Sequence, residues 1–345
     1  MASRSSPSGK RRRPGQRTEK ERRASLGPAP APAAPGAAPP GRPPGARPSG
    51  KRPGPAGAGS PGSETPTAGG TPPGAPSGAS LIYGRNPVRE ALRGHRRVHT
   101  VWLTPGAPGE DLGAALIDWA AQAGKPTPEI RHATSAQLIA MAGSPDHQSM
   151  VAAVDPYEYL EPETLLQRFT LLVALDEVQD PHNLGAIIRT AEGAGAGVVI
   201  PRHRAAEVTS AVVKASAGAT EHAGIAQVRN LADFLAAAKK AGYWVYGAAA
   251  GATSEYTAQD YRYPTCFVVG SEGQGLGRRV ESLCDVIVSL PLRGQVDSLN
   301  VSVSTGILLY EAVRQRQAAA ATAAAAPSGG PAPESERALE DGGDS

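Results

Sequence analysis

The sequence is poor in cysteine and has no long apolar run. Cys266 and Cys284 are its only cysteines among 345 residues. Two cysteines build neither a disulfide framework nor a four-cysteine zinc site, which excludes a disulfide-stapled secreted scaffold. No apolar run reaches the roughly 18 residues that cross a bilayer, and no secretory apolar stretch follows Met1. We therefore expect a cytoplasmic protein with no metal and no membrane segment.

Residues 1–80 also lack large apolar side chains, because Pro, Gly, Ala, Ser and Arg make up almost all of them. Such a segment buries too little surface to offset the entropy lost on ordering, so we expect a disordered arm. It holds thirteen Lys and Arg against three Glu, about +10, whereas the rest of the chain sums to about −7. A basic arm suits attraction to RNA. A solubilising tail is an equally good interpretation, and a targeting peptide is disfavoured by the many prolines.

Residues 81–155 have the pattern of a small α/β unit. Val98–Leu103 alternates as a strand does, and Asn86 followed by Pro87 is typical of a helix start. The expected helices cover 86–93, 113–124 and 135–141, and a second strand covers 149–154. A linker is expected at 156–164.

Residues 165–316 have a clearer α/β pattern. The apolar run 169–175 is typical of a strand buried on both faces of a parallel sheet. Strands alternate with helices, which predicts a parallel sheet with helices on both faces and its chemistry beyond the carboxyl ends of the strands. The further strands are expected at 197–200, 244–247, 266–269 and 286–290, and the helices at 183–194, 210–217, 231–241 and 301–316. We expect residues 317–345 to form a disordered Ala-rich and acidic tail.

Three loops of this second region follow strands and are rich in polar residues or glycine. The first runs from Asp176 to Asn183 and enters the helix that carries Arg189. The second, Gly270–Gly277, has glycines that let a ligand approach the backbone, and it lacks the Gly-Lys-Ser/Thr of a phosphate-binding loop. The third spans 290–302. Each signal alone has an ordinary explanation, since asparagine and serine at helix starts are usually caps.

Taken together, the three loops resemble the three ordered motifs of the SpoU/TrmH family of SPOUT methyltransferases. The matching segments are Asn183-Leu-Gly-Ala-Ile-Ile-Arg189, Gly270-Ser-Glu272-Gly-Gln-Gly and Leu290-Pro-Leu followed by Ser298-Leu-Asn300-Val-Ser302. Residues 81–155, which open with Ile82-Tyr-Gly-Arg-Asn-Pro, resemble the RNA substrate-binding domain of that family. The combination is most similar to the 23S rRNA guanosine 2′-O-methyltransferases.

The resemblance implies methyl transfer from S-adenosylmethionine to a ribose 2′-hydroxyl of RNA, a C-terminal trefoil knot, and a homodimer whose sites use both protomers. It implies that Arg189 activates the ribose hydroxyl beside Asn183. The implied catalytic residues are Asn183, Arg189, Glu272, Ser298 and Asn300, and the implied cofactor-binding residues are Gly270, Leu290 and Leu299. Arginine is normally charged, so Arg189 either accepts the proton with help from an RNA phosphate or stabilises the developing oxyanion.

Other functions compatible with the sequence differ in substrate or in class. Methylation of a tRNA ribose, or of an rRNA adenosine as in thiostrepton resistance, would use the same catalytic residues. A non-catalytic RNA-binding protein of ribosome assembly would keep the fold, but the intact polar motif residues argue against it. A nucleotide-dependent oxidoreductase or NTPase rests only on the glycine loop and lacks the lysine that a phosphate-binding loop requires.

Overall fold

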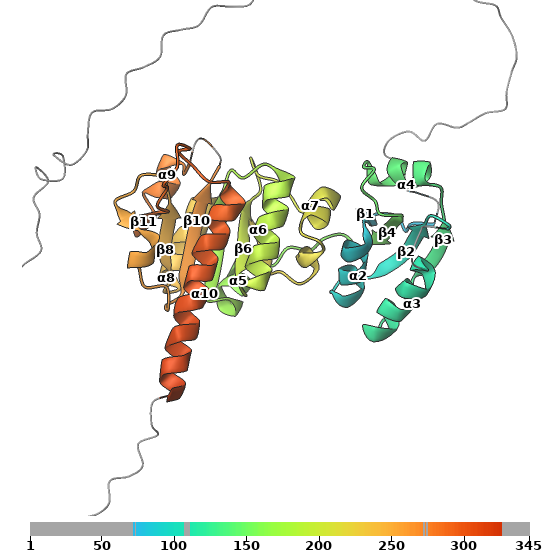
Figure 1. Cartoon of the computed structure of the whole chain (residues 1–345), viewed down its shortest axis with the longest axis horizontal. Coiled ribbons are helices and arrows are strands. Elements are labelled where there is room, and N and C mark those ends of the chain that lie inside the picture. Colours follow the sequence, from blue (N-terminus) through green and yellow to red (C-terminus); the bar gives the residue numbers. More distant parts are fainter. Residues whose placement is uncertain (1–71, 73, 107–110, 272, 274, 326–345) are drawn as a thin grey trace, which may run out of the picture. The chain divides into compact units, whose positions relative to one another are not determined.

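The computed structural model describes residues 72, 74–106, 111–271, 273 and 275–325, all of them in one compact unit, Glu64–Ser345. Almost all of the basic arm expected at residues 1–80 lies outside the described residues, and so do Glu272 and the tail beyond Ala325. Among the described helices, none is long and apolar enough to cross a membrane. Figure 1 shows two α/β domains, which are taken in turn.

The amino-terminal domain has a four-stranded sheet in the spatial order β1-β4-β2-β3. Its strands are β1 (Ser80–Tyr83), β2 (Val98–Leu103), β3 (Glu129–His132) and β4 (Met150–Val154), and its helices are α2 (Arg85–Arg93), α3 (Leu112–Gln122) and α4 (Ser135–Ala142). The small α/β unit is therefore confirmed, with two strands, β1 and β3, that the sequence pattern did not reveal. The expected cap at Asn86 is wrong, because α2 begins after Gly84, whose φ of 101° favours glycine, and no side chain caps it.

The second domain has seven strands in the spatial order β7-β6-β5-β10-β8-β11-β9, and every neighbouring pair is parallel. The expected parallel sheet is thus confirmed. Its strands are β5 (Leu171–Asp176), β6 (Gly197–Pro201), β7 (Ile225–Val228), β8 (Trp244–Ala248), β9 (Ser254–Glu255), β10 (Thr265–Gly270) and β11 (Val286–Ser289). Its helices are α5 (Pro162–Arg168), α6 (Pro181–Gly193), α7 (Ser210–Ala215), α8 (Leu231–Lys240), α9 (Arg278–Glu281) and α10 (Val301–Ala325), with 3₁₀ turns at Ala219–Glu221 and Tyr256–Ala258.

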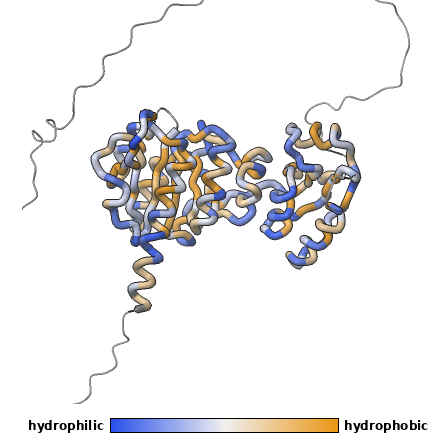
Figure 2. The backbone as a smooth tube through the Cα atoms, in the orientation of Figure 1, coloured by the Kyte–Doolittle hydropathy of each residue, from blue (hydrophilic) through white to orange (hydrophobic). Residues whose placement is uncertain are grey.

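Alternation along the central strands divides the core of this domain into two layers. On β5, Leu171, Val173 and Leu175 pack in one cluster with apolar residues of α6 and α10. Leu172 and Ala174 point the other way, into a cluster with α5 and α8. Figure 2 shows the apolar strands between more polar helix surfaces. Helices therefore cover both faces of the sheet, as expected.

Two boundaries differ from the sequence prediction. Helix α5 occupies residues 162–168, across the expected linker and the expected domain start at 165. Helix α10 continues to Ala325 instead of ending near Arg316. Seven of the eight residues 318–325 are alanine, the best helix former, so the helix continues beyond the residues that the sheet covers.

Arg316 fastens α10 to the start of the sheet. Its guanidinium donates to the backbone oxygens of Tyr261, Thr170 and Tyr263 at 2.9, 3.0 and 2.8 Å, and to Thr170 Oγ1 at 3.0 Å. Burial lowers the pKa of Arg316. The ordinary pKa of arginine is far above neutral pH, so the guanidinium stays charged. One side chain therefore joins the last helix to the segments that enter β5 and β10.

We expect Arg316→Ala to lower the free energy of unfolding by about 2 kcal/mol, because charge-assisted hydrogen bonds to backbone carbonyls are lost. Urea denaturation followed by circular dichroism measures the change. Arg314→Ala is the matched control, since Arg314 is an exposed neighbour on α10 that pairs only with Glu311. Equal effects of the two substitutions would contradict the role given to Arg316.

Candidate active site

Two of the three predicted loops begin side by side at one edge of the sheet. Strands β5 and β10 are paired in parallel, with Gly270 directly opposite Asp176. The loop after β5 and the glycine loop after β10 therefore leave the sheet together. This edge, at the carboxyl ends of the strands, is where parallel α/β sheets bind ligands.

Asn183 does not cap α6, contrary to the ordinary explanation of its position. The cap is Asp180, whose Oδ1 accepts from the His182 N–H at 3.0 Å, with Pro181 in the first turn. Asn183 follows inside that turn, so its side chain is not needed for capping. Its Oδ1 accepts a hydrogen bond from Asn300 Nδ2 at 2.8 Å.

Asn300 has two roles at the start of α10. Its Oδ1 accepts from the backbone N–H groups of Ser302 and Val303 at 2.9 and 3.4 Å, which caps the helix. Its amide nitrogen donates to Asn183 from the same side chain. The structure therefore brings together the first and third predicted loops, 117 residues apart.

A cavity of about 380 Å³, the apolar cavity, opens near these asparagines. It is lined by the loops that follow β8, β10 and β11. Four of the predicted residues line it: Gly270, Leu290, Ser298 and Leu299. Ser271, Asp297 and Ser304 also line it and were not predicted. Its size and mainly apolar wall are typical of a site for a small organic ligand.

The glycine loop requires its first glycine. A Cβ on Gly270 would lie 2.0 Å from the backbone oxygen of Gly275, closer than any real contact. The loop folds back because the Gly275 N–H donates to the Ser271 oxygen at 3.0 Å, and Gly273 and Gly275 have φ of 87° and 67°. The backbone at Gly270 thus stays bare and faces the apolar cavity.

Asp176 holds the far end of this loop and was not among the predicted residues. It is 9% exposed, and its Oδ2 accepts from the Gly277 N–H at 2.7 Å. Burial raises the pKa of Asp176, and the hydrogen bond from Gly277 opposes that rise. The only sequence signal is its place at the end of the apolar run of β5, which says nothing of its partner 101 residues away.

A second, more polar hollow of about 280 Å³ adjoins the apolar cavity. We call it the polar hollow; Glu177, Gln179, Asp180 and Asn183 line it, and it shares Ser271 and Val301 with the apolar cavity. Ser271 and Val301 therefore lie where the two spaces meet, and Asn183 lies on the polar side. A reactive polar group of one ligand and a small molecule in the apolar cavity would approach each other here.

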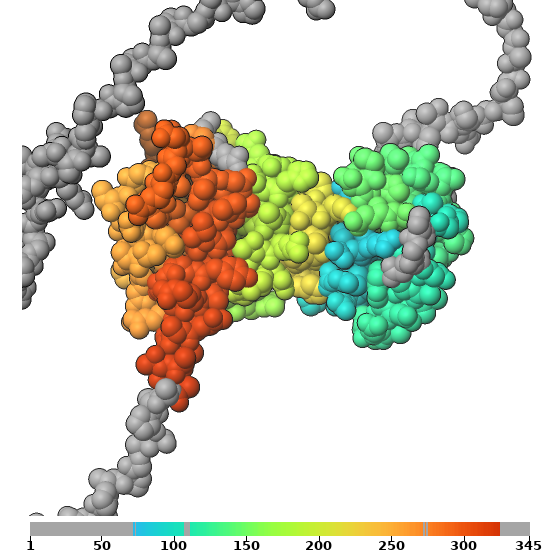
Figure 3. Space-filling model, in the orientation of Figure 1, coloured from blue at the N-terminus to red at the C-terminus, as the bar shows by residue number. Residues whose placement is uncertain are grey.

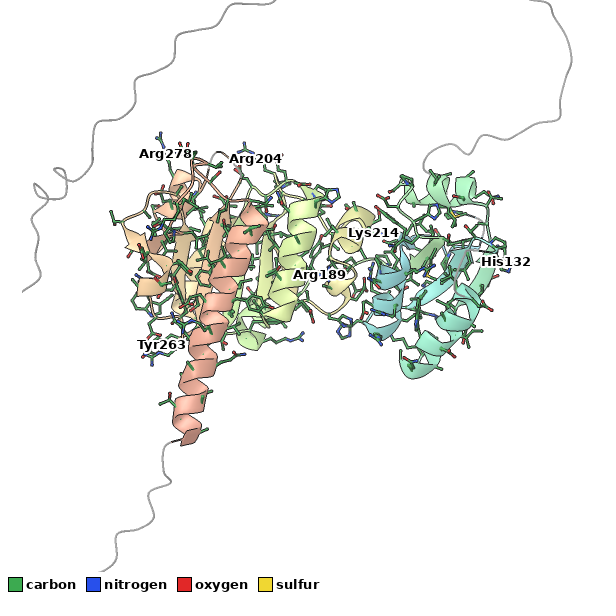
Figure 4. The ribbon with its side chains drawn as sticks, in the orientation of Figure 1. His132, Arg189, Arg204, Lys214, Tyr263 and Arg278 are labelled. Carbon is green, nitrogen blue, oxygen red and sulfur yellow. The ribbon has the colours of Figure 1, made fainter. Side chains whose placement is uncertain are left out.

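Arg189 lies apart from these groups. It is exposed on α6 and lines neither space, and within the part of the chain that the structure describes no hydrogen bond or ion pair holds its guanidinium. Figure 4 shows it farther along α6 than the end of the domain where Arg204 and Arg278 lie. The single chain thus assembles Asn183, Ser298 and Asn300 but not Arg189, and Glu272 lies outside the described residues.

Two other kinds of chemistry find no support in the site. Burial raises the pKa of the Cys284 thiol to about 12 and also raises that of Cys266, so neither is a ready nucleophile. Among residues 72–325 that the structure describes, no group of three or more His, Cys, Asp or Glu side chains could hold a metal ion.

Comparison with known proteins shows which family has this fold and these loops. The SpoU rRNA Methylase family matches residues 170–310, and the RNA 2′-O ribose methyltransferase substrate-binding family matches residues 81–160. The 23S rRNA (guanosine-2′-O-)-methyltransferase RlmB of Pseudomonas putida is 40% identical over 244 residues, which cover 68% of this chain and 96% of that protein. The chain belongs to the SpoU rRNA methylase family.

Other relatives agree with this assignment. An uncharacterized tRNA/rRNA methyltransferase of Mycolicibacterium smegmatis is 39% identical over 69% of this chain and 77% of its own length. The SpoU methyltransferase AviRb of Streptomyces viridochromogenes, solved in complex with AdoMet, superposes with a TM-score of 0.57 at 26% identity, over 70% of this chain and 91% of AviRb. An AdoMet-bound rRNA methyltransferase of Sinorhizobium meliloti gives 0.56 at 25% identity, over 69% and 88% of the two chains.

The chain is accordingly an RNA methyltransferase, and its cofactor is S-adenosylmethionine. The apolar cavity fits this cofactor in two ways that the structure shows. Its wall is mainly apolar, as an adenosine requires, and the bare backbone at Gly270 gives polar groups that a ligand can reach.

We expect Gly270→Ala to weaken S-adenosylmethionine binding on the order of 100-fold. The new methyl group would collide with the backbone of Gly275 and displace the glycine loop. Isothermal titration calorimetry measures the dissociation constant. Gly294→Ala is the matched control, since the nearest atom to its Cβ would be Val296 N at 4.0 Å. Unchanged binding by Gly270→Ala would refute the assignment of this loop to the cofactor.

Proposed function

We propose that this protein methylates the ribose 2′-hydroxyl of a guanosine in 23S rRNA. The observation that carries the reaction type is the Asn300–Asn183 hydrogen bond, which orients Asn183 in the polar hollow next to the apolar cavity. The RNA target is supported by the substrate-binding domain at residues 81–160 and by the likeness to the Pseudomonas putida enzyme. A cytoplasmic location goes with that substrate.

The residues around the apolar cavity would bind and orient the cofactor. Gly270 offers backbone groups without a side chain in the way, and Leu290 and Leu299 supply apolar wall. When bound, S-adenosylmethionine supplies a methyl group already activated by its sulfonium, so the chain contributes mainly alignment. Ser298 would complete the wall, and Asn300 at the start of α10 would orient Asn183 beside it.

The polar hollow would receive the target ribose. A ribose hydroxyl is a poor nucleophile until its proton leaves, so a polar group within hydrogen-bond reach is needed. Asn183 lines the hollow, and its bond to Asn300 fixes its orientation. Arg189 would act on the same oxygen, either by accepting the proton or by stabilising the negative charge that develops.

A homodimer would bring Arg189 to the site. In one chain all residues from Pro291 to Asn300 are exposed, and on α10 Val303 and Tyr310 are each 51% exposed. Helix α10 packs on α6, which carries Arg189, so these apolar residues and the arginine lie on neighbouring helices. Figure 3 shows the surface of α10 running along the domain. A second copy seated here would cover the apolar side chains and supply its own Arg189.

The trefoil knot belongs to the same proposal. Strand β11 pairs with β8 beyond β10, and α10 then returns to pack on α6 and β10. The loops after β8, β10 and β11 all line the apolar cavity. This return of the chain, together with membership of the SpoU family, supports a knot that forms the cofactor site.

We expect Arg189→Ala to reduce kcat for RNA methylation on the order of 100-fold or more, while S-adenosylmethionine binding is unchanged. Transfer of radioactive methyl groups to an unmodified 23S rRNA transcript measures the first quantity, and calorimetry the second. Arg168→Ala is the control, because Arg168 is an exposed arginine on α5, at the opposite edge of the sheet. Retained activity would eliminate the role of Arg189.

Mixing two inactive variants tests the shared site. If Arg189→Ala and Gly270→Ala subunits exchange, each mixed dimer has one intact site, and an equal mixture recovers about a quarter of wild-type activity. No recovery in a mixture that exchanges subunits would place Arg189 and the glycine loop of one site in the same protomer.

Mapping of 2′-O-methyl groups in RNA from a deletion strain tests the target. We expect one 23S rRNA guanosine to lose its methyl group and to regain it with the wild-type gene but not with the Arg189→Ala gene. Loss at a tRNA ribose or at an rRNA adenosine would replace the proposed target and keep the reaction. An unchanged map would remove both.

A further inference from the structure

Five arginines gather at the carboxyl-end edge of the second sheet, beyond the residues that line the apolar cavity. We call this group the arginine rim: Arg202, Arg204, Arg229, Arg278 and Arg279. All five are exposed. The first two follow β6, Arg229 follows β7, and the last two open α9. Figure 4 shows Arg204 and Arg278 pointing outward at this edge, opposite the end of the domain that holds Tyr263.

Contacts of the backbone hold the rim together. The Arg202 N–H donates to the Val228 oxygen at 2.8 Å, so Arg202 lies beside Arg229. Arg229 and Arg279, with His203 and the first residues of α8, line a hollow of about 400 Å³, the arginine hollow. The amino end of α8, a ten-residue helix capped by Asn230, opens into it. Three elements therefore direct positive charge to one place.

Most guanidinium groups of the rim have no partner among the described residues. Within the described chain, no hydrogen bond or ion pair engages the side chains of Arg202, Arg229, Arg278 or Arg279, and Arg204 pairs with exposed Glu177 at 3.2 Å. Three carboxylates also line the arginine hollow, Asp176, Glu177 and Asp233, so its guanidinium groups lie among acidic side chains. Asp176 accepts from the Gly277 N–H, and Glu177 pairs with Arg204. Residues 81–325 hold 21 Lys and Arg against 24 Asp and Glu, so the rim is a local cluster of arginines in a nearly balanced domain region.

The arginine hollow connects with the proposed reaction site. It shares Glu177 with the polar hollow, which in turn shares Ser271 and Val301 with the apolar cavity. The three spaces form a continuous series along the ends of the strands. A polymer whose reactive group enters the polar hollow would pass its neighbouring units over the rim.

We propose that the arginine rim binds the phosphates of nucleotides adjacent to the target nucleotide, an inference that rests on the proposed RNA methylation. Guanidinium groups bind phosphate oxygens through paired hydrogen bonds, and the amino end of a helix adds favourable partial charge. The rim reads no sequence, because phosphates are common to every nucleotide. Its function is to place the strand so that one ribose reaches Asn183.

The double substitution Arg229→Ala/Arg279→Ala tests the rim. We expect KM for an unmodified 23S rRNA transcript to rise on the order of tenfold, with kcat at saturating RNA and the dissociation constant of S-adenosylmethionine unchanged. In RNA binding measured over a range of KCl concentrations, the slope of log K against log salt should fall by about 1.4 to 1.8, since two phosphate contacts are lost. Arg168→Ala/Lys240→Ala, at the opposite edge of the sheet, is the control.

The outcomes separate this inference from the proposed function. If wild-type protein does not methylate the transcript, the chosen RNA target fails first and the rim is tested on the RNA that the methyl map identifies. If wild type is active and the rim variant matches the control in KM and salt slope, the rim does not bind RNA phosphates. A loss of kcat without a change in KM or in the salt slope would also overturn the inference.

Discussion

The hydrogen bond between Asn300 and Asn183 is the contact on which the rest of the site depends. It joins the first turn of α6 to the start of α10, and the same Asn300 side chain caps α10. Helix capping thus fixes the direction of a polar group at the reaction site. A residue that satisfies a helix end and a partner at once can be moved only by disturbing both, which keeps the apolar cavity and the polar hollow in a constant relation.

Features with a local period were predicted from the sequence. The apolar run of β5 and the alternation of strands and helices indicated a parallel sheet covered on both faces, and the structure has this architecture. Four residues given by the motif resemblance, Gly270, Leu290, Ser298 and Leu299, line one cavity. The architecture follows from burial patterns that a short window of sequence contains, whereas the roles of the four residues come from the resemblance and stay predictions.

Contacts between distant segments could not be predicted in this way. Asp176 and Gly277 are 101 residues apart, and no feature of either segment indicates that the two form a hydrogen bond. Asparagine and aspartate both favour the N-cap position, so the sequence alone did not decide between Asn183 and Asp180, three residues earlier. In the structure Asp180 is the cap. The exposed position of Arg189 depends on how α6 packs against α10, which is a tertiary property.

The arrangement of charge along the strand ends separates the sites for the ribose and for the phosphates of an RNA strand. The polar hollow is lined by Glu177 and Asp180 and by no arginine or lysine, so it suits the hydroxyl groups of a ribose, which can donate to carboxylates and amides. The arginine rim, one space farther on, attracts the phosphate. Arginines next to a hollow without them would therefore orient the strand as well as bind it, because the phosphate goes to the arginines and the sugar to the polar hollow.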